Sequence, residues 1–369
     1  MNLFILETFV SLDTLAPILD LISNRRKKTG ILIINPLNNF SSFDLYKHIQ
    51  KKINLQINLP LNHFAKIELF FLKSLLFLPN SFLFKTSKIW AYYSGKNFSS
   101  KKLIKRAFID KKISSITFEE SLSKNLAAEL YQVAEELKIK MIKIPSGLNT
   151  ILLPSINDRF LRYCNYYIAP NKIRKVKENT KKSKILYLGS LRYRLSWIKK
   201  LRKIYKLKKI NNHRKIGLLN KQNSEEYPIL QSIKKKLNKL KNIQIFESFK
   251  PRTRYPIQIS NLSFKSYLTG HVIYNTDIIL CARSSSVIIE GIINNNKILY
   301  LNYINPHLKK TFLYKYKIIK KINTEKEMLK FVNNPSNKKE KKFTREITKK
   351  FLINFKKEER IESDYLKLY

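Results

Sequence analysis

The segment TDIILCARSSSVIIEGIINNNKILYLNY, residues 276–303, decides the fold of this chain. It opens with a continuous apolar run, passes through a polar loop and a helical stretch, and closes with a second apolar run, KILYLNY. Continuous apolar runs are typical of parallel strands that are buried on both faces. Parallel neighbours are joined by a crossover, which is usually a helix. The segment therefore predicts a strand–helix–strand unit of an α/β protein.

The same unit recurs on both sides of this segment. A chain of 369 residues is long enough for two domains. We therefore predict an α/β fold with two Rossmann-like, doubly wound parallel-sheet domains. Strands are expected at 2–9, 30–36, 114–120, 140–146 and 165–170 in the first half, and at 184–190, 215–221, 242–249, 276–282 and 297–303 in the second, with an edge strand at 312–319.

Helices are expected between these strands, where apolar residues recur at helical spacing. The first helix is expected over 11–24, with Ser11 or Asp13 as its N-cap. Further helices are expected over 121–139, 195–207, 226–240, 324–334 and 342–356. The basic, polar run 171–184 is a candidate linker. The expected domains are 1–175, 184–341 and a helical tail, 342–369, for which packing back on the N-terminal domain is one arrangement.

The loop Arg283-Ser284-Ser285-Ser286 is the strongest candidate binding site. It follows a predicted strand, and ligands of open parallel sheets bind beyond the carboxyl ends of the strands. A helix start offers free N–H groups to a phosphate, and the serine hydroxyls and the arginine add donors. Glu290 lies in the following helix, where it can accept from a sugar hydroxyl. The alternative is that Ser284 only caps the helix and Glu290 is a solvated acid.

This pattern resembles the C-terminal domain of GT-B-fold glycosyltransferases, and it is similar to the related glycerophosphotransferases and nucleotide-sugar epimerases. The resemblance implies two domains that face each other across a cleft. It implies a nucleotide-activated donor, bound by Ser284, Ser285 and Ser286 at its diphosphate and by Glu290 at a hydroxyl. The group usually has Gly-Lys-Pro before the next strand, whereas this chain has Asn296-Lys297-Ile298.

A second candidate phosphate site follows the strand expected at 184–190. The sequence YLGSLRYRLSW places Gly189 and Ser190 in a turn, with Arg192 and Arg194 behind it. A tight turn near arginines suits a phosphate-bearing ligand, and Arg192 is the better candidate because it is nearer the turn. The alternative is an ordinary strand–helix turn in a basic protein.

The N-terminal half is expected to hold the acceptor, which the resemblance implies to be a glycan or a lipid-linked glycan. Glu119 and Glu120 follow a predicted strand, so either could act as the general base for an acceptor hydroxyl. The alternative is that they stabilise the start of the next helix, where acids are favourable.

The charge is extreme: 73 Lys and Arg stand against 26 Asp and Glu, a net charge of +47. Such a charge attracts nucleotide-linked substrates, nucleic acid or an anionic membrane. A/T-rich codons explain much of the lysine but not the scarcity of acids. A nucleic-acid-binding protein is the rival hypothesis, although the basic residues are dispersed and no nucleic-acid-binding signature is present.

The motifs that the sequence lacks argue against several classes of enzyme and metal-binding protein. The chain has no Walker loop, no GxGxxG, no HExxH and no CxxC. Two cysteines in apolar runs, Cys164 and Cys281, indicate buried thiols. We therefore expect no cofactor and no metal, with leaving-group charge offset by basic groups and helix dipoles.

The expected location is the cytoplasm, with peripheral attachment to the inner face of the cytoplasmic membrane left open. The first residues, MNLFILETFVSLD, lack a basic lead-in, and Glu7 interrupts the apolar run, as in a buried strand. The apolar stretch 67–84 is interrupted by charges and a proline, which favours a core helix over an interfacial one. The functional hypothesis is a glycosyltransferase-like enzyme of surface-polysaccharide synthesis; a non-catalytic protein of the same fold is the other alternative.

Overall fold

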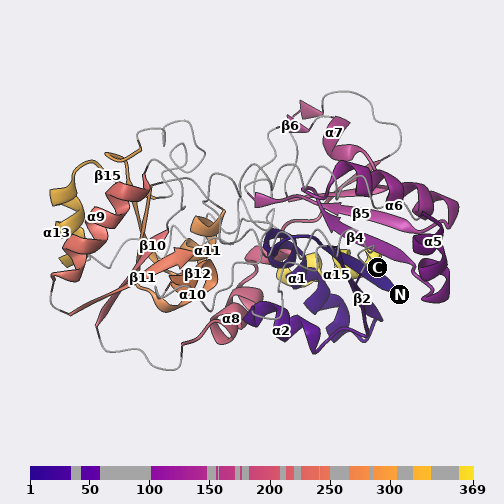
Figure 1. Cartoon of the computed structure of the whole chain (residues 1–369), viewed down its shortest axis with the longest axis horizontal. Helices are drawn as coiled ribbons and strands as arrows, with labels where there is room; N and C mark the ends of the chain where they lie inside the picture. The colour runs from indigo at the N-terminus through magenta and orange to yellow at the C-terminus, as the bar shows by residue number, and fades with distance from the viewer. Residues whose placement is uncertain are drawn as a thin grey trace, which may run out of the picture.

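A computed structural model of the chain contains two parallel β-sheets that lie side by side along the long axis (Figure 1). This confirms the predicted α/β class. The structure describes residues 1–34, 43–58, 101–147, 155–156, 158–170, 175–176, 183–207, 213–219, 226–240, 242–249, 266–282, 286–305, 319–333 and 357–369.

The first sheet has seven strands in the order β3-β2-β1-β4-β5-β7-β9, and all of its described pairings are parallel. Its strands are β1 (Asn2–Leu6), β2 (Thr29–Ile33), β3 (Leu55–Asn58), β4 (Ser115–Glu119), β5 (Lys140–Ile144), β7 (Tyr166–Ala169) and β9 (Lys184–Tyr187). Strands β1, β2 and β4 are buried along their whole length, as expected of parallel strands covered on both faces.

Helices cover both faces of this sheet. They are α1 (Phe9–Asn24), α2 (Asp44–Gln50), α5 (Lys101–Asp110), α6 (Lys124–Glu136) and the short α7 (Asp158–Leu161). Helix α1 begins earlier than predicted. Its N-cap is Thr8, which forms a capping box with Ser11, so the choice of Ser11 or Asp13 was wrong. A separate pair of short strands, β6 (Ser155–Ile156) and β8 (Lys175–Val176), lies outside the two large sheets.

The second sheet has six parallel strands in the order β12-β11-β10-β13-β14-β15. They are β10 (Arg214–Leu219), β11 (Ile243–Phe249), β12 (Ser266–Leu268), β13 (Ile278–Cys281), β14 (Lys297–Leu301) and β15 (Lys320–Ile322). Its helices are α9 (Tyr227–Asn238), α10 (Thr269–Asn275), α11 (Val287–Ile293) and α13 (Glu325–Asn333). Thr324 accepts a hydrogen bond from Glu327 N at the start of α13.

The segment between the sheets corrects one expectation. Strand β9 was predicted to open the second sheet, but it pairs with β7 and forms the edge of the first. The short 3-10 helix η3 (Leu191–Tyr193) and helix α8 (Leu195–Ile204) follow it. Helix α8 packs against α2 of the first half and against α10 and α11 of the second, so the two halves join through this helix.

The C-terminal helix α15 (Glu358–Leu368) returns to the first half, where it packs against α1. Figure 1 shows the two termini close together beside the first sheet. The largest hydrophobic core runs without a break from α1 and α15 through α8 to α10 and α11. Two further cores fill the other face of each sheet.

Three expectations fall outside the described residues: the apolar stretch 67–84, the helix at 342–356 and nearly all of the strand at 312–319. Among the helices that the structure describes, none is long and apolar enough to cross a membrane. Both Cys164 and Cys281 are buried thiols, as predicted.

Candidate functional site

Helix α11 places Glu290 at the junction of the two sheets. As expected, the helix follows β13 and carries Glu290 in its first turn. Ser286 occupies the N-cap position and is buried, so the alternative in which Ser284 caps the helix is wrong. Arg283, Ser284 and Ser285 lie outside the described residues.

Glu290 belongs to a buried charge cluster that joins the two halves. Arg192 Nε donates to Glu290 Oε1 at 2.6 Å, and its NH2 group ion-pairs with Asp13 of α1. The side chains of Arg192 and Glu290 are each only 5% exposed, which overturns the alternative of a solvated helix acid. One guanidinium thus lies between a carboxylate of the first half and a carboxylate of the second.

The electrostatics of this cluster follow from burial. Burial raises the pKa of Glu290 to about 7, against the opposing effect of the Arg192 charge. Burial also raises the pKa of Asp13. For Arg192, burial alone would lower the pKa, but the charges of Asp13 and Glu290 raise it above its usual value, so the guanidinium stays charged. Two carboxyl groups therefore share one buried cation, and at least one of them can hold a proton near neutral pH.

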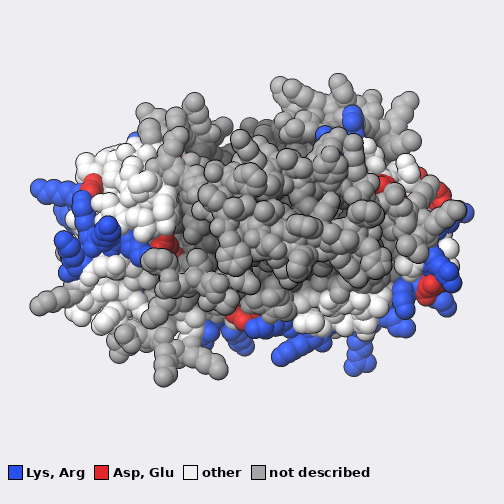
Figure 2. All heavy atoms as spheres, in the orientation of Figure 1, with Lys and Arg blue, Asp and Glu red and all other residues white. Residues whose placement is uncertain are grey.

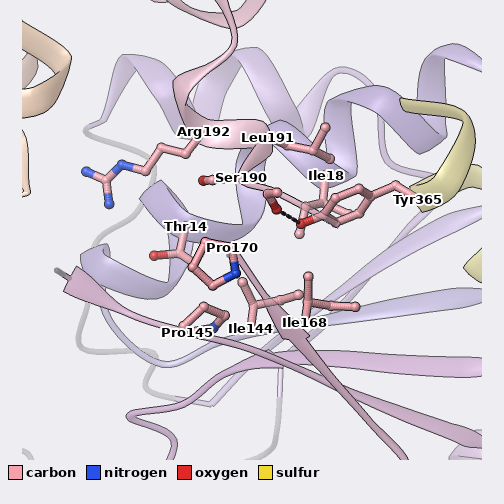
Figure 3. A pocket seen from close by; sticks show the side chains of 11 residues that line it. Thr14, Ile18, Ile144, Pro145, Ile168, Pro170, Ser190, Leu191, Arg192 and Tyr365 are labelled. Atoms are coloured by element: carbon pink, nitrogen blue, oxygen red, sulfur yellow. Dashed lines mark hydrogen bonds between the residues drawn. The ribbon is translucent and has the colours of Figure 1, made fainter. Parts of the chain in front are cut away.

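Gly189 and Ser190 line a small cavity at the carboxyl ends of β5, β7 and β9 (Figure 3). Gly189 has a φ of +85°, a conformation that favours glycine, and its carbonyl accepts from Tyr365 Oη at 2.9 Å. The cavity measures about 20 Å³, enough for one water molecule. Figure 3 shows the guanidinium of Arg192 pointing away from Tyr365. Arg194 lies elsewhere, in an ion pair with Glu362 of α15.

The two candidate bases lie at the end of β4, where Glu119 is the last strand residue and Glu120 follows it, and both make local contacts. Glu119 is 1% exposed and accepts from Ser121 Oγ, while its Oε1 has no hydrogen-bond partner among the described residues. Burial raises its pKa to about 7. Glu120 accepts from Ser146 Oγ at 2.9 Å and from Tyr167 Oη at 3.1 Å. Neither carboxylate has a described contact with Arg192 or Glu290.

No protein-family model matches the sequence, and no curated protein matches it. Solved structures do match over nearly the whole chain. UDP-GlcNAc 2-epimerase from Neisseria meningitidis, bound to UDP-GlcNAc, matches with a TM-score of 0.55 at 10% identity, covering 100% of both chains. UDP-GlcNAc 2-epimerase from Methanocaldococcus jannaschii, in complex with UDP-GlcNAc and UDP, matches with a TM-score of 0.53 at 14% identity, covering 100% of this chain and 99% of the other.

A third match is a protein from Listeria monocytogenes described as a UDP-N-acetylglucosamine 2-epimerase, with a TM-score of 0.51 at 9% identity, covering 98% of this chain and 93% of the other. The chain has the GT-B fold. At these identities the likeness establishes the architecture of two sheet domains, as the sequence predicted, and not the activity.

In this GT-B fold a second contact crosses between the halves. His271 Nε2 of α10 lies 3.1 Å from Asp44 Oδ2 at the start of α2. The edge of its ring meets Tyr205, with 5.0 Å between ring centroids, and Tyr205 also stacks on Tyr274. Burial lowers the pKa of His271, although Asp44 opposes this. The histidine thus packs between helices of the two GT-B halves.

Asp13 is the site residue that the sequence reasoning missed. It was considered only as a helix cap, yet its carboxylate pairs with Arg192 at the junction. A signal was present: Asp13 and Asp20 interrupt an otherwise apolar helix, and a buried acid needs a partner. Asp20 is indeed buried, and hydrogen bonds with His48, Lys200 and Lys52 hold its pKa well below the usual range despite burial. Among the residues that the structure describes, no cluster of metal-binding side chains is present.

Proposed function

We propose that this chain transfers a sugar or a polyol phosphate from a nucleotide-activated donor to a glycan or lipid-linked acceptor in surface-polysaccharide synthesis, without a metal. The observation that carries the proposal is the placement of Glu290. It lies just after the serine loop of the second sheet, buried at the junction and tied through Arg192 to the first half. Two GT-B structures of similar architecture are bound to UDP-GlcNAc.

The proposed donor site lies between the carboxyl end of β13 in the second sheet and that of β9 at the edge of the first, and residues 184–341 other than β9 would form the donor domain. Its proposed phosphate contacts are Gly189, Ser190, Arg192, Arg283, Ser284, Ser285 and Ser286. Glu290 would accept from a donor hydroxyl. In the structure the guanidinium of Arg192 is paired with the carboxylates of Asp13 and Glu290. A diphosphate that binds Arg192 must therefore replace one of these two carboxylates. A bound diphosphate can offer an arginine two strong, charge-assisted hydrogen bonds.

The acceptor would bind in 1–175, where three carboxylates are candidates for the general base. Glu119 has a pKa of about 7, suited to proton transfer near neutral pH. Glu120 already accepts two hydrogen bonds. Asp13 is a third candidate, since it forms an ion pair with Arg192, a proposed donor contact.

The first experiment measures thermal unfolding with a panel of nucleoside diphosphates and nucleotide-linked sugars and polyols. A ligand at about 100 times its Kd adds about 2.7 kcal/mol to the stability. We expect a selective shift with one nucleotide. Replacing Glu290 with glutamine should weaken that ligand by roughly 10- to 100-fold, because a hydrogen bond to a charged acceptor is worth about 1.5–3 kcal/mol.

The matched control is Glu325→Gln, which removes an acid from the first turn of α13, away from the junction. It should leave the ligand shift unchanged. Equal weakening by both substitutions would contradict the assigned site. A panel that gives no shift, alongside a strong shift with RNA, would favour the nucleic-acid hypothesis instead.

Epimerisation of the donor sugar is the second candidate. It is favoured by the pKa of about 7 at Glu290, since such a carboxyl group can both take and give a proton near neutral pH. The two activities differ in their products. Transfer releases a nucleotide only when an acceptor is present, whereas epimerisation changes the sugar and leaves it attached.

A further inference from the structure

The amino-terminal edge of the first sheet, opposite the carboxyl ends that carry the candidate site, is lined by basic turns. We call this surface the basic edge. It consists of the exposed lysines and arginines in the turns that enter β2, β3, β4, β5 and β9: Arg25, Arg26, Lys28, Lys51, Lys111, Lys112, Lys138, Lys140 and Lys184. Figure 2 shows blue side chains at the right-hand end and lower side of the molecule, with fewer red ones among them.

Three of these turns share one backbone motif. Helices α1, α5 and α6 each end in a Schellman motif, in which the N–H after the left-handed residue bonds to a carbonyl five residues earlier. The bonds are Lys27 N to Ile22 O at 3.4 Å, Ile113 N to Phe108 O at 3.0 Å and Ile139 N to Ala134 O at 2.8 Å. The left-handed residues are Arg26, Lys112 and Lys138, with φ of 57°, 49° and 54°.

A basic residue is an unfavourable choice at this position. The left-handed conformation is unfavourable for most residues, and glycine or asparagine is preferred there. In the second half, α11 ends in the same motif, with Asn296 N bonded to Gly291 O, and uses Asn295 at φ 67°. Codons for lysine and asparagine are equally A/T-rich, so codon bias does not account for the difference. The first half therefore retains positive charge at this edge against the local backbone preference.

The charge at this edge is not neutralised locally. No residue of the basic edge forms an ion pair with a carboxylate that the structure describes. Three exposed acids lie nearby: Asp110, Glu135 and Glu136. Of these, Glu136 pairs with Lys105, and Glu135 accepts from Asn165.

We propose that the basic edge docks on the surface of an anionic lipid bilayer. Its charges are spread along several turns of one sheet edge, which suits a planar partner. Ile109, with 54% of its surface exposed, stands beside Lys111 and Lys112 as an apolar side chain for the headgroup layer. The aromatic rings near this edge, Tyr131 and Tyr163, are half-buried and contact each other, so they are not presented for base stacking.

This orientation leaves the carboxyl ends of the first sheet, where the acceptor is proposed to bind, facing away from the lipid, so it suits a glycan acceptor in solution and not a lipid-linked one. The inference rests on the basic edge alone and does not require the proposed transferase activity. A negative result for bilayer binding would therefore leave the proposed nucleotide binding untouched, and a negative result for nucleotide binding would leave the proposed bilayer binding untouched.

The test is co-sedimentation with phosphatidylglycerol–phosphatidylcholine vesicles, compared with phosphatidylcholine alone. The informative variant carries Arg26→Asn, Lys112→Asn and Lys138→Asn. Asparagine suits the left-handed position, so the unfolding temperature should be unchanged or higher. Each basic residue near an anionic surface is worth about 1 kcal/mol, or about fivefold, so the triple variant should bind about a hundredfold more weakly. The control removes the same charge from the second half with Lys235→Gln, Lys239→Gln and Lys330→Gln.

Three results would overturn the proposal. The first is no preference of the wild-type chain for anionic vesicles. The second is an equal loss of binding in the two triple variants, which would show a response to net charge alone. The third is tighter binding to single-stranded RNA than to the vesicles, weakened selectively by the asparagine variant, which would identify a nucleic-acid partner.

Discussion

At the scale of single residues, the buried cluster of Asp13, Arg192 and Glu290 is the most unusual feature of the chain. Burying a charge is costly unless it is paired. Here one guanidinium serves two carboxylates, so the ionised cluster would carry an uncompensated negative charge on an almost fully buried Glu290 and a partly buried Asp13. Protonation of one carboxyl group removes that charge, which is why burial raises the pKa of both acids.

The stability of the protein should therefore decrease as the pH rises from about 5 to 8. Glu290 titrates near 7 when folded but near 4.5 when unfolded, so between these values the folded state binds more protons. Raising the pH through this window removes that advantage. Each pKa unit is worth about 1.4 kcal/mol, so Glu290 should contribute up to about 3 kcal/mol to the change. Urea unfolding of the wild type and of Glu290→Gln, measured at several pH values, checks this; the variant should show a smaller slope.

The comparison between variants matters because other groups titrate in the same range. Glu119, also raised to about 7 by burial, contributes in the same sense as Glu290. His271, lowered by burial, acts in the opposite sense below its unfolded pKa, where the unfolded state binds more protons. If the stability of Glu290→Gln depended on pH as steeply as that of the wild type, the charge of Arg192 would fully offset the cost of burying an ionised Glu290.

At the scale of elements, the packing of α10 on the end of α8 depends on Gly270. A Cβ there would lie 2.6 Å from two ring atoms of the buried Tyr205. The ring is rigid and stacked on Tyr274, so it cannot yield easily. Gly270→Ala should lower the free energy of unfolding by about 1–2 kcal/mol, because overpacking costs about 1–3 kcal/mol and the helix gains up to about 1. Chemical denaturation measures this difference.

Gly291→Ala is the matched control, since it also adds a methyl group inside a helix of the second half. Its Cβ would come closest to the terminal methyl groups of Ile298 and Ile279, at 2.9 and 3.0 Å. These ends can move, so the loss should be smaller than for Gly270→Ala. The reverse order would show that α11 packs more rigidly than α10.

The strands and most helices could be predicted from local pattern, because burial on both faces of a parallel sheet imposes continuous apolar runs. The sheet to which a strand belongs could not be predicted in this way. Strand β9 has the same apolar pattern whether it closes the first sheet or opens the second, and only its pairing with β7 decides. The cap of α1 was missed for a similar reason: Thr8, Ser11 and Asp13 all suit an N-cap, and the start of the helix fixes the choice.

The candidate site was predicted in part. Position in a strand–helix–strand unit was enough to select Glu290, and a glycine turn was enough to select Gly189 and Arg192. The hydrogen bond between Arg192 and Glu290 joins residues that are 98 positions apart in the sequence, and no local sequence pattern predicts such a tertiary contact. The place of Asp13 in an apolar helix was a signal of a buried partner, but the identity of that partner depends on the packing of α1 on η3.

At the scale of the whole molecule, the chain connects its halves twice. The first connection is the segment from β9 to α8. The second is α15, which follows the second sheet in sequence but packs on the first. Tyr369 stacks on Phe4 of β1 and shares a hydrogen bond of 2.8 Å with Thr117 of β4, while Lys27 donates to Leu366 O at 3.0 Å. The acids at the start of α15 meet α8: Glu358 accepts from Leu195 N at 2.7 Å.

Weakening α15 should therefore destabilise the first half, although the helix lies at the far end of the sequence. Ile361 is fully buried in the core that joins the halves, and Ile361→Ala should cost about 2–5 kcal/mol. Amide hydrogen exchange locates the effect: α1 and the first sheet should exchange faster, while α9 and α13 should change little. Ser363→Ala, exposed on the same helix, is the control and should stay within about 0.5 kcal/mol of wild type. Faster exchange in α13 with no change in α1 would mean that α15 stabilises the second half instead.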